Sequence, residues 1–493
     1  MATHFTAGMG ALWVQVDGPN TQPVYLGCHQ LGDIEEPQGD VELIYCPDPS
    51  APNRFKVVGS VQGAAGSVTS SLTTDVTDDL DYLERVLCPF PLYVNMIKSG
   101  RKDVFTNFDR AFVLTGARIT SKGLTALAAR TPDDNTRSEQ SFDLSGESLL
   151  RFVVLELSRQ STSEANGMFD ITFCNEQTCR TDEDVAQAAC ETGYIACAAA
   201  GGGTANVMRT VNGSTWAPCA ADPFAADEDV IAVECFETGR DAVRVVVARG
   251  TTDASNPPEI AYTDDSGATW TAVDVGSDNT EFVQFQHAMY AHDRNAIWLG
   301  TDKGVLYKSE DAGLTWTQVD DGTLLGGEGV NSIHFCDADV GFVAGDANAF
   351  ARSLDGGDSW SAITGPAAGV VLNVVFCLDR NRVWVGTAGG ELWYSNNGGT
   401  TWAERSFTGT GVGMVNDIKF MNDHVGYLAK NVAVPANGGS TIQYTIDGGY
   451  TWTALTTPEN DGLNSVWLCD LWNVYCVGAA ESATGFIGKG IVA

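Results

Sequence analysis

A short motif that ends in tryptophan recurs through the second half of the chain. A degenerate copy ends at Trp216, and five good copies occupy Thr263–Trp270, Ser309–Trp316, Ser353–Trp360, Ser395–Trp402 and Thr445–Trp452. Successive tryptophans are 54, 46, 44, 42 and 50 residues apart. Self-similarity at such a period is typical of repeat architectures, in which each repeat is one supersecondary unit that buries its apolar face against its neighbours.

Each copy of the motif predicts a locked hairpin tip. An Asp or Asn two places after a hydroxyl residue accepts backbone N–H groups of its own turn. The glycine two places later takes up a backbone conformation that other residues find strained, and the tryptophan opens the next strand with a large buried ring. We assign a structural role, without chemistry, to Asp265, Gly267, Trp270, Asp311, Gly313, Trp316, Asp355, Gly357, Trp360, Asn397, Gly399, Trp402, Asp447, Gly449 and Trp452.

The segments between the tips read as short strands. Residues 331–336, 341–345 and 349–352 lead into the third good copy, and residues 372–377 and 382–386 repeat that layout one period later. Four strands in about 45 residues indicate one blade of a β-propeller. The sequence therefore predicts a mainly β protein whose second half is a propeller.

The pattern also predicts how the ring closes. Six motif-bearing units end near Trp452, and residues 463–469, 474–477 and 485–488 supply three strands of a seventh. The fourth strand must come from elsewhere, and Met168–Phe173 is the expected donor. We predict seven blades, closed by pairing N- and C-terminal strands of the ring so that no edge is left exposed.

These motifs resemble the Asp-box (bacterial neuraminidase repeat) family over residues 168–493. The resemblance implies a propeller. Some members of the family are sialidases, which grip their substrate with a cluster of arginines, and the Phe-Arg-Ile-Pro-like signature of those enzymes is absent at the start of the repeats. Arg244, Arg352 and Arg382 are the arginines considered for such a cluster, and the favoured reading of each is a solvated charge at a strand end.

Residues 1–157 lack the repeat and predict a separate domain, joined by a linker at 158–167. A helix is expected over 78–88, because Thr77 can cap it, three leucines form one apolar face and Pro89 ends it. The remainder predicts a β-sandwich or barrel-like domain, with strands at residues 12–16, 41–45, 54–58, 92–96, 111–114 and 150–155.

This front domain resembles the major tail (tube) proteins of long-tailed bacteriophages. The resemblance lies in helix 78–88 with the following residues 88–94, in residues 114–120 and 128–135, and in the closing segment 141–147. It implies a virion subunit that forms six-membered rings with copies of itself, stacks them into a tube through which DNA passes, contacts other tail proteins and is assembled in the host cytoplasm. The helix and loops 98–110 and 120–140 are then the expected ring-to-ring contacts, and the propeller faces outward.

Charge separates the two parts of the chain and excludes some partners. The formal charge is −35, of which −7 lies in residues 1–160 and −28 in the rest. Binding DNA begins with neutralising phosphates, so the exposed acidic surface does not predict nucleic acid as its partner. No apolar run reaches about 18 residues, and the start lacks a basic stretch followed by an apolar one. Neither a membrane anchor nor a secretory signal is expected.

No residue pattern nominates an active site, cofactor site or metal site, so we expect no enzyme activity. His287 and His292 are five residues apart, which places them on opposite faces of a strand. The cysteines follow the repeat: Cys190, Cys235, Cys336, Cys377 and Cys469 are each interpreted as ending a first strand. Cross-strand disulfides are considered for two pairs seven residues apart, Cys190–Cys197 and Cys469–Cys476.

Three alternatives stay open. One is a sialidase-like or other glycoside hydrolase propeller. A second is a propeller that binds glycans or proteins of a host surface, alone or as part of the virion, with the insertions 248–260 and 430–442 as contact loops. A third, a photosystem assembly factor-like propeller, shares the repeats but leaves residues 1–157 unexplained.

Overall fold

The computed structural model describes nine strand backbones between residues 8 and 153 and most of the chain after them. The later ranges are 155–160, 167–174, 192–199, 206–224, 228–239, 242–250, 259–275, 283–407, 413–422, 424–432, 442–455, 462–469, 473–478 and 485–492. These residues hold strands and one short 3-10 helix, η1 (Asp346–Asn348). No helix among them combines the length and apolarity needed to span a bilayer. The expected helix 78–88 lies outside the described residues.

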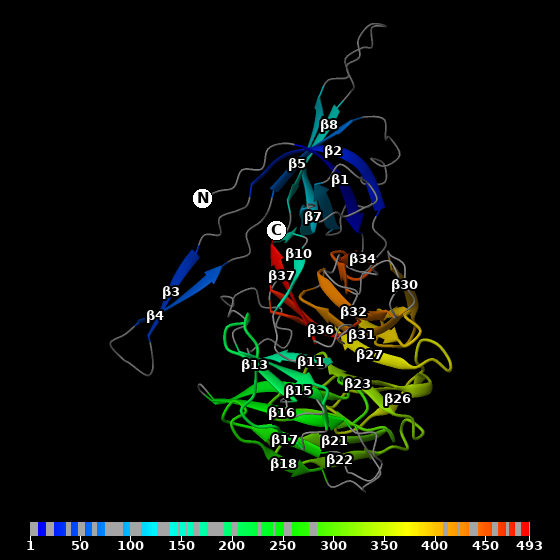
Figure 1. Ribbon diagram of the computed structural model, residues 1–493. Coiled ribbons are helices and arrows are strands. Elements are labelled where there is room, and N and C mark those ends of the chain that lie inside the picture. Colours follow the sequence, from blue (N-terminus) through cyan, green and yellow to red (C-terminus); the bar gives the residue numbers. More distant parts are fainter. Residues whose placement is uncertain are drawn as a thin grey trace.

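The described part from residue 155 onward forms a seven-bladed β-propeller with four antiparallel strands in each blade (Figure 1). The first three blades, in chain order, consist of β11 (Met168–Phe173), β12 (Gly193–Cys197), β13 (Val207–Thr210), β14 (Ala217–Pro218); β15 (Asp229–Gly239), β16 (Ala242–Gly250), β17 (Glu259–Thr263), β18 (Thr271–Asp274); and β19 (Met289–Asp293), β20 (Ala296–Gly300), β21 (Val305–Ser309), β22 (Thr317–Asp321).

Blades 4 to 6 follow the same order from inner to outer strand. They consist of β23 (Val330–Phe335), β24 (Gly341–Gly345), β25 (Phe350–Ser353), β26 (Ser361–Ala362); β27 (Leu372–Cys377), β28 (Val383–Thr387), β29 (Leu392–Ser395), β30 (Ala403–Phe407); and β31 (Gly413–Phe420), β32 (Gly426–Val432), β33 (Ile442–Thr445), β34 (Thr451–Leu455). The outer strands β30 and β34 also pair with each other in parallel, which joins blades 5 and 6 into one sheet.

The seventh blade closes the ring and corrects the predicted donor strand. It pairs β35 (Leu463–Leu468), β36 (Val474–Gly478) and β37 (Phe486–Val492) with β10 (Leu155–Arg159), which lies beside β37 in Figure 1. Met168–Phe173 is instead β11, the inner strand of blade 1. The propeller therefore takes its first strand from residues that the sequence analysis placed at the end of the front domain and the start of the linker.

The core lies between the blades. Inner and second strands such as β23, β24, β27 and β28 are buried along their whole length, as expected for strands covered on both faces. Aromatic rings cross from one blade to the next: Trp298 of blade 3 stacks on Phe335 of blade 4 with ring centroids 3.7 Å apart. Such contacts between neighbours are what tie the repeats of a propeller together.

The strands of the front region form one large sheet and a separate hairpin. The sheet has the order β6–β1–β2–β5–β8–β7–β9, and β7 also pairs with β6. Strands β1, β3, β4, β6, β7 and β9 overlap the predicted ones, whereas β2, β5 and β8 were not predicted. The strands are β1 (Gly8–Gln15), β2 (Val24–Glu35), β3 (Val41–Pro47), β4 (Phe55–Val61), β5 (Ser67–Thr73), β6 (Leu92–Lys98), β7 (Arg110–Thr125), β8 (Glu139–Ser145) and β9 (Ser148–Val153), with β3 and β4 making the hairpin.

Candidate functional site

The turn lock predicted for the repeated motif is present, and blade 4 shows its geometry. Ser353 Oγ donates a hydrogen bond to Asp355 Oδ1 (2.9 Å) and accepts one from the Gly357 N–H (2.8 Å). Asp355 accepts the Ser359 N–H (2.9 Å) and the Ser359 hydroxyl. Gly357 sits at φ +78°, the left-handed region that glycine tolerates best. One hydroxyl and one carboxylate thus satisfy the backbone of the whole turn.

Three of the other four good copies repeat these hydrogen bonds, and in the fourth Asn397 Nδ2 donates to the Thr401 hydroxyl instead of accepting from it. Hydrogen bonding from the Thr269 hydroxyl and amide lowers the pKa of Asp265 to about 2, and the Ser359 hydroxyl and amide likewise lower the pKa of Asp355. In blade 6 the turn is buried, and burial raises the pKa of Asp447 instead. The equivalent bonds are made around Asp265 and Gly267, Asp311 and Gly313, Asn397 and Gly399, and Asp447 and Gly449.

The turns also fasten each blade to the preceding one. A Cβ built at Gly357 would overlap Nε1 of Trp298 in blade 3, and one at Gly449 would lie 2.7 Å from Nε1 of Trp384 in blade 5. Trp360 and Trp402 pack edge-to-face on Phe335 and Phe350, and Trp452 packs in the same way on Phe420 with centroids 5.7 Å apart. Trp452 is fully buried, whereas Trp270, Trp316, Trp360 and Trp402 are half-buried. The repeated motif therefore supports the fold.

We predict that Ser353→Ala destabilises the propeller by about 1–3 kcal/mol, because it leaves the buried N–H of Gly357 without an acceptor. Ser361→Ala, an exposed serine of the same blade, is the matched control and should change the free energy of unfolding by less than about 0.5 kcal/mol. Urea unfolding of both variants measures the difference. Equal stability of the two variants would contradict the turn lock.

The three arginines considered as a substrate-binding cluster lie in three different blades, and each interacts with groups of the protein itself. Arg244 pairs with Asp264 (2.8 Å) and donates to the carbonyl of Ala312 in the motif of blade 3. Arg352 donates to the carbonyl of Gly398 in the motif of blade 5 (3.1 Å), and Arg382 pairs with Asp379 (2.6 Å). The first two are thus ties between neighbouring blades, which corrects their reading as solvated strand-end charges.

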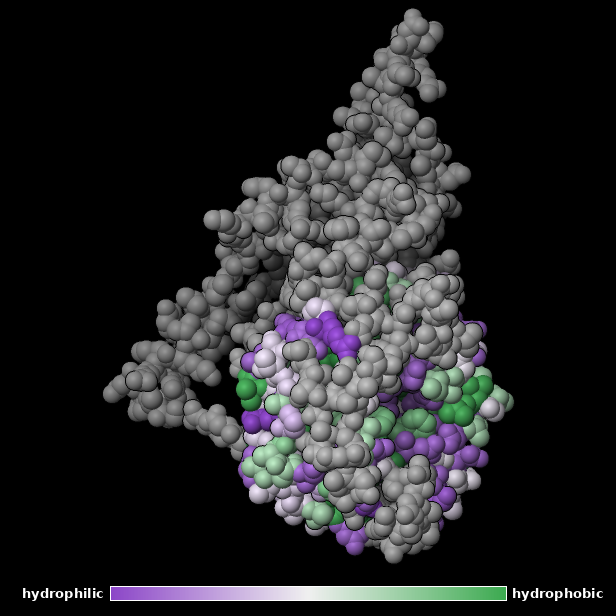
Figure 2. All heavy atoms as spheres, in the orientation of Figure 1, coloured by the Kyte–Doolittle hydropathy of each residue, from purple (hydrophilic) through white to green (hydrophobic). Residues whose placement is uncertain are grey.

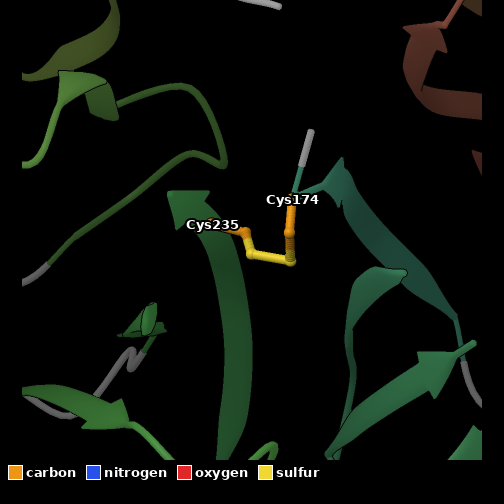
Figure 3. The surroundings of a disulfide bond; sticks show 2 residues. All are labelled: Cys174 and Cys235. Atoms are coloured by element: carbon orange, nitrogen blue, oxygen red, sulfur yellow. A yellow bond between two sulfur atoms is a disulfide. The ribbon is translucent and has the colours of Figure 1, made fainter. Parts of the chain in front are cut away.

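The cysteine pairing differs from the predicted one. Cys174, directly after β11, forms a disulfide with Cys235 in β15, so the bond links the inner strands of blades 1 and 2 (Figure 3). Cys197 and Cys476 are buried and form no disulfide bond. The pairs Cys190–Cys197 and Cys469–Cys476 are therefore wrong, although Cys469 is itself disulfide-bonded.

The repeat position of the cysteines explains this error. Cys174, Cys336, Cys377 and Cys469 end or directly follow inner strands, and Cys235 lies near the end of its own. Cys190 instead precedes the second strand of blade 1. The position at the end of the first strand, which the sequence analysis assigned to Cys190, is occupied by Cys174. Residues at one repeat position of neighbouring blades approach each other across the blade boundary, which spacing within one blade does not reveal.

A cluster of buried polar groups lies where the inner strands meet at the axis of the propeller. Asp170 of blade 1 accepts the N–H of Val233 in blade 2 (3.1 Å), and Asp417 of blade 6 accepts the N–H of Val466 in blade 7 (2.9 Å). Ser465 of blade 7 lies between them. These side chains are almost fully buried. Buried polar groups need hydrogen-bond partners, and each carboxylate accepts hydrogen bonds from a neighbouring blade.

Side chains cross the axis from opposite sides of the ring. His287, at the start of blade 3, places Nε2 3.4 Å from Asp417 Oδ1 of blade 6. Gln286 Nε2 donates to the carbonyl of Asn464 in blade 7 (3.1 Å). Burial lowers the pKa of His287 to about 4, so its imidazole is neutral at neutral pH despite the adjacent Asp417. The axis is therefore bridged at this level.

Asparagines at the bulge of the inner strands add a second set of ties. Asn331, Asn416 and Asn464 each donate through Nδ2 to the carbonyl of the residue before the bulge in the next blade, at Leu372 (3.0 Å), Leu463 (3.0 Å) and Met168 (2.8 Å). The ladder skips one residue at each of these positions. A bulge turns the extra side chain out of the regular alternation, which allows it to reach the neighbouring blade.

Burial has the largest effect on the pKa values of two acidic groups at the axis, Asp170 and Glu234. It raises the pKa of Asp170 to about 7, an effect that the Val233 N–H and the charge of Lys419 oppose and the nearby Asp417 increases. Burial and the charge of Asp170 raise the pKa of Glu234 in blade 2 to about 8. Both carboxyl groups are therefore substantially protonated near neutral pH. The described residues contain no group of three or more His, Cys, Asp or Glu side chains arranged to hold a metal ion.

Sequence reasoning did not single out this axial cluster. Asp417 and Ser465 directly follow the bulge asparagines, and Ser332 directly follows Asn331 in the same way. An asparagine followed by a small polar residue near the start of the first strand recurs in blades 4, 6 and 7, and this was the available signal. His287, which had been weighed only for metal binding, belongs to the cluster, whereas His292 is not seen to bond to it. The insertions 248–260 and 430–442 lie mostly outside the described residues.

Comparison with known proteins gives similar folds only. No family model and no curated protein sequence matches the chain. YCF48 from Cyanidioschyzon merolae aligns with 68% of this chain and 98% of its own at 18% identity and a TM-score of 0.49. A GH74 xyloglucanase from Xanthomonas campestris covers 67% of this chain and 55% of its own (13%, 0.49), and a streptogramin B lyase covers 68% and 97% (14%, 0.48). At this similarity none of them transfers a function.

Proposed function

We propose that this protein is a structural virion subunit, a tail-tube protein whose front region assembles into stacked hexameric rings and whose propeller decorates the outside. The observation that carries the proposal is the continuity of the two regions. Strand β9 of the front sheet ends at Val153, and β10, which closes the propeller, begins at Leu155. Only one residue separates β9 from β10. In the proposed assembly every front region therefore carries a propeller, attached through β10 of the blade that closes the ring.

The strand pairings of the front region support assembly. The pairs β6–β1, β1–β2, β2–β5, β5–β8, β8–β7 and β7–β6 return on themselves, so these strands have partners on both sides. Among the described strands, β9 pairs only with β7, and β3 and β4 only with each other. Unpaired strand edges are templates for pairing with another chain. We infer that β9 and the β3–β4 hairpin contribute to contacts between copies.

The propeller suits an outward position. Figure 2 shows hydrophobic side chains on the visible face of the described propeller as separate patches among hydrophilic ones, without a continuous apolar surface. Most of the negative charge of the chain lies in this half, and like charge keeps particles apart in solution. The axis is bridged by His287 and Asp417, so in this proposal DNA passes through the tube of front regions and not through the propeller.

We expect electron microscopy of the purified full chain to show six-membered rings or stacked tubes with peripheral densities of propeller size. Sedimentation at several protein concentrations supplies the second measurement. A chain that stays monomeric at the highest concentration and forms no rings would overturn the proposal. Turnover of a fluorogenic sialoside or glucoside by the same preparation would instead support the hydrolase alternative. That alternative is weakened because Arg244, Arg352 and Arg382 come from three different blades and bond to groups of the protein itself.

A further inference from the structure

The two close contacts of Ser465 Oγ need two protons. Ser465 has one hydroxyl proton, and ionised carboxylates have none. Ser465 Oγ lies 3.1 Å from Asp170 Oδ1 and 3.0 Å from Asp417 Oδ2. A serine hydroxyl has one proton and can donate to only one of them. If both carboxylates were ionised, the other contact would place two acceptors against each other in a buried site, which is costly.

The surroundings decide which carboxyl carries the extra proton. Asp417 Oδ1 lies 3.4 Å from His287 Nε2 and 3.7 Å from Lys419 Nζ, and Asp417 also accepts two backbone N–H groups. Asp170 accepts two backbone N–H groups, from Ile171 and Val233, and forms no ion pair in the described part of the chain. A neighbouring cation favours the charged form of a carboxyl. Lys419 also acts on Asp170, but its ion pair is with Asp417, so the extra proton belongs on Asp170.

We propose that the proton held by Asp170 is a latch: Asp170 donates it to Ser465, Ser465 donates to Asp417, and loss of the proton loosens the seam where the ring of blades closes. The chain of hydrogen bonds joins blade 1 to blades 7 and 6, and the Val233 N–H extends it to blade 2. Deprotonation leaves Ser465 with two competing acceptors and places a second negative charge beside Asp417. The inference is independent of the proposed assembly and concerns the propeller alone.

Few other groups on the surrounding strands titrate in the same range. The strands packed on β11 are β12, β15, β35 and β36. Strand β15 contributes Glu234 to the axis, and β35 carries no titratable side chain. Strands β12 and β36 carry tyrosine and cysteine side chains, whose ordinary pKa values lie above neutral pH. Beyond them, Asp417 and Lys419 act on Asp170 through their charges, and His287 lies beside Asp417.

The sign of the pH effect follows from the raised folded-state pKa. A carboxyl that keeps its proton in the folded protein contributes stability fully below its unfolded pKa of about 4. For Asp170 this contribution is lost as the pH rises from there to about 7, and for Glu234 as it rises to about 8. We therefore expect the melting temperature of the full chain to fall between about pH 5 and pH 8 and to level off above that range.

Infrared spectroscopy of the full chain over the same pH range tests the latch directly. The wild-type protein should show carboxylic acid carbonyl absorption that disappears through neutral pH, and Asp170→Asn should remove the component with a midpoint near pH 7, leave the Glu234 component and reduce the fall in melting temperature. Glu404→Gln, which removes an exposed carboxylate of blade 5, is the matched control and should change neither signal. Glu234→Gln separates the second raised carboxyl and should leave the Asp170 band in place.

Asp417→Asn keeps the test decisive even if Asp170→Asn does not fold. Without the charge of Asp417, the Ser465 hydroxyl is free to donate to an ionised Asp170, so the midpoint of the band should move down by about one pH unit or more. An unmoved midpoint would overturn the latch. The absence of a carboxylic band in the wild-type protein at about pH 6, or a band that Asp170→Asn leaves unchanged, would overturn it as well.

Discussion

Gly357→Ala is expected to destabilise the propeller by about 3–5 kcal/mol, since two costs coincide at this position. The residue lies at φ +78°, where an L side chain strains the backbone. Its new Cβ would also overlap Nε1 of Trp298, a fully buried ring of blade 3. Because tightly packed interiors yield little, the overlap has to be relieved by moving blade 4 away from blade 3.

Two variants separate strain from overlap. Gly369→Ala has a similar φ of +73° but no heavy atom within 4 Å of the added Cβ, so it should cost only about 1–2 kcal/mol. Trp298→Phe removes the Nε1 atom, which has no hydrogen-bond partner in the described structure. In that background Gly357→Ala should lose a large part of its effect in urea unfolding. Equal costs for the Gly357 and Gly369 variants would show that the contact between the blades is unimportant.

The sequence was most informative where structure is local. The hydroxyl, acid and glycine of each motif lie within five residues of one another, and their hydrogen bonds form within that turn, as in Thr263–Gly267. Strands between the motifs followed from their apolar runs, so β24 (Gly341–Gly345) and β27 (Leu372–Cys377) were predicted to the residue. The period then gave the number of blades.

Features that depend on partners far away in the chain were missed. Closure pairs Leu155 with Val492, and local pattern identifies a strand without naming its partner. The polar groups of the axis look like ordinary members of buried strands until the ring brings Asp170 and Ser465, 295 residues apart, into contact. The cysteine pairing was predicted wrongly for the same reason, because the two bonded cysteines lie in different blades.

Removal of the Cys174–Cys235 disulfide is expected to cost about 4 kcal/mol in the free energy of unfolding. The bond closes a loop with a sequence separation of 61 residues, and cross-linking a loop of that size restricts the unfolded chain by about this amount. It joins the inner strands of blades 1 and 2. We therefore expect the Cys174→Ala, Cys235→Ala double variant to unfold at markedly lower urea concentration than the wild-type protein.

Cys336→Ala provides the matched control. Cys336 occupies the equivalent place after the inner strand of blade 4 but is a half-exposed free thiol, so its loss should change the stability by less than about 1 kcal/mol. Protein isolated from a reducing cytoplasm with its thiols blocked at lysis should resemble the double variant, because such disulfides form in oxidising surroundings. Equal stability of the reduced and oxidised proteins would mean that the hydrogen bonds between blades 1 and 2, and not the disulfide, hold this part of the ring.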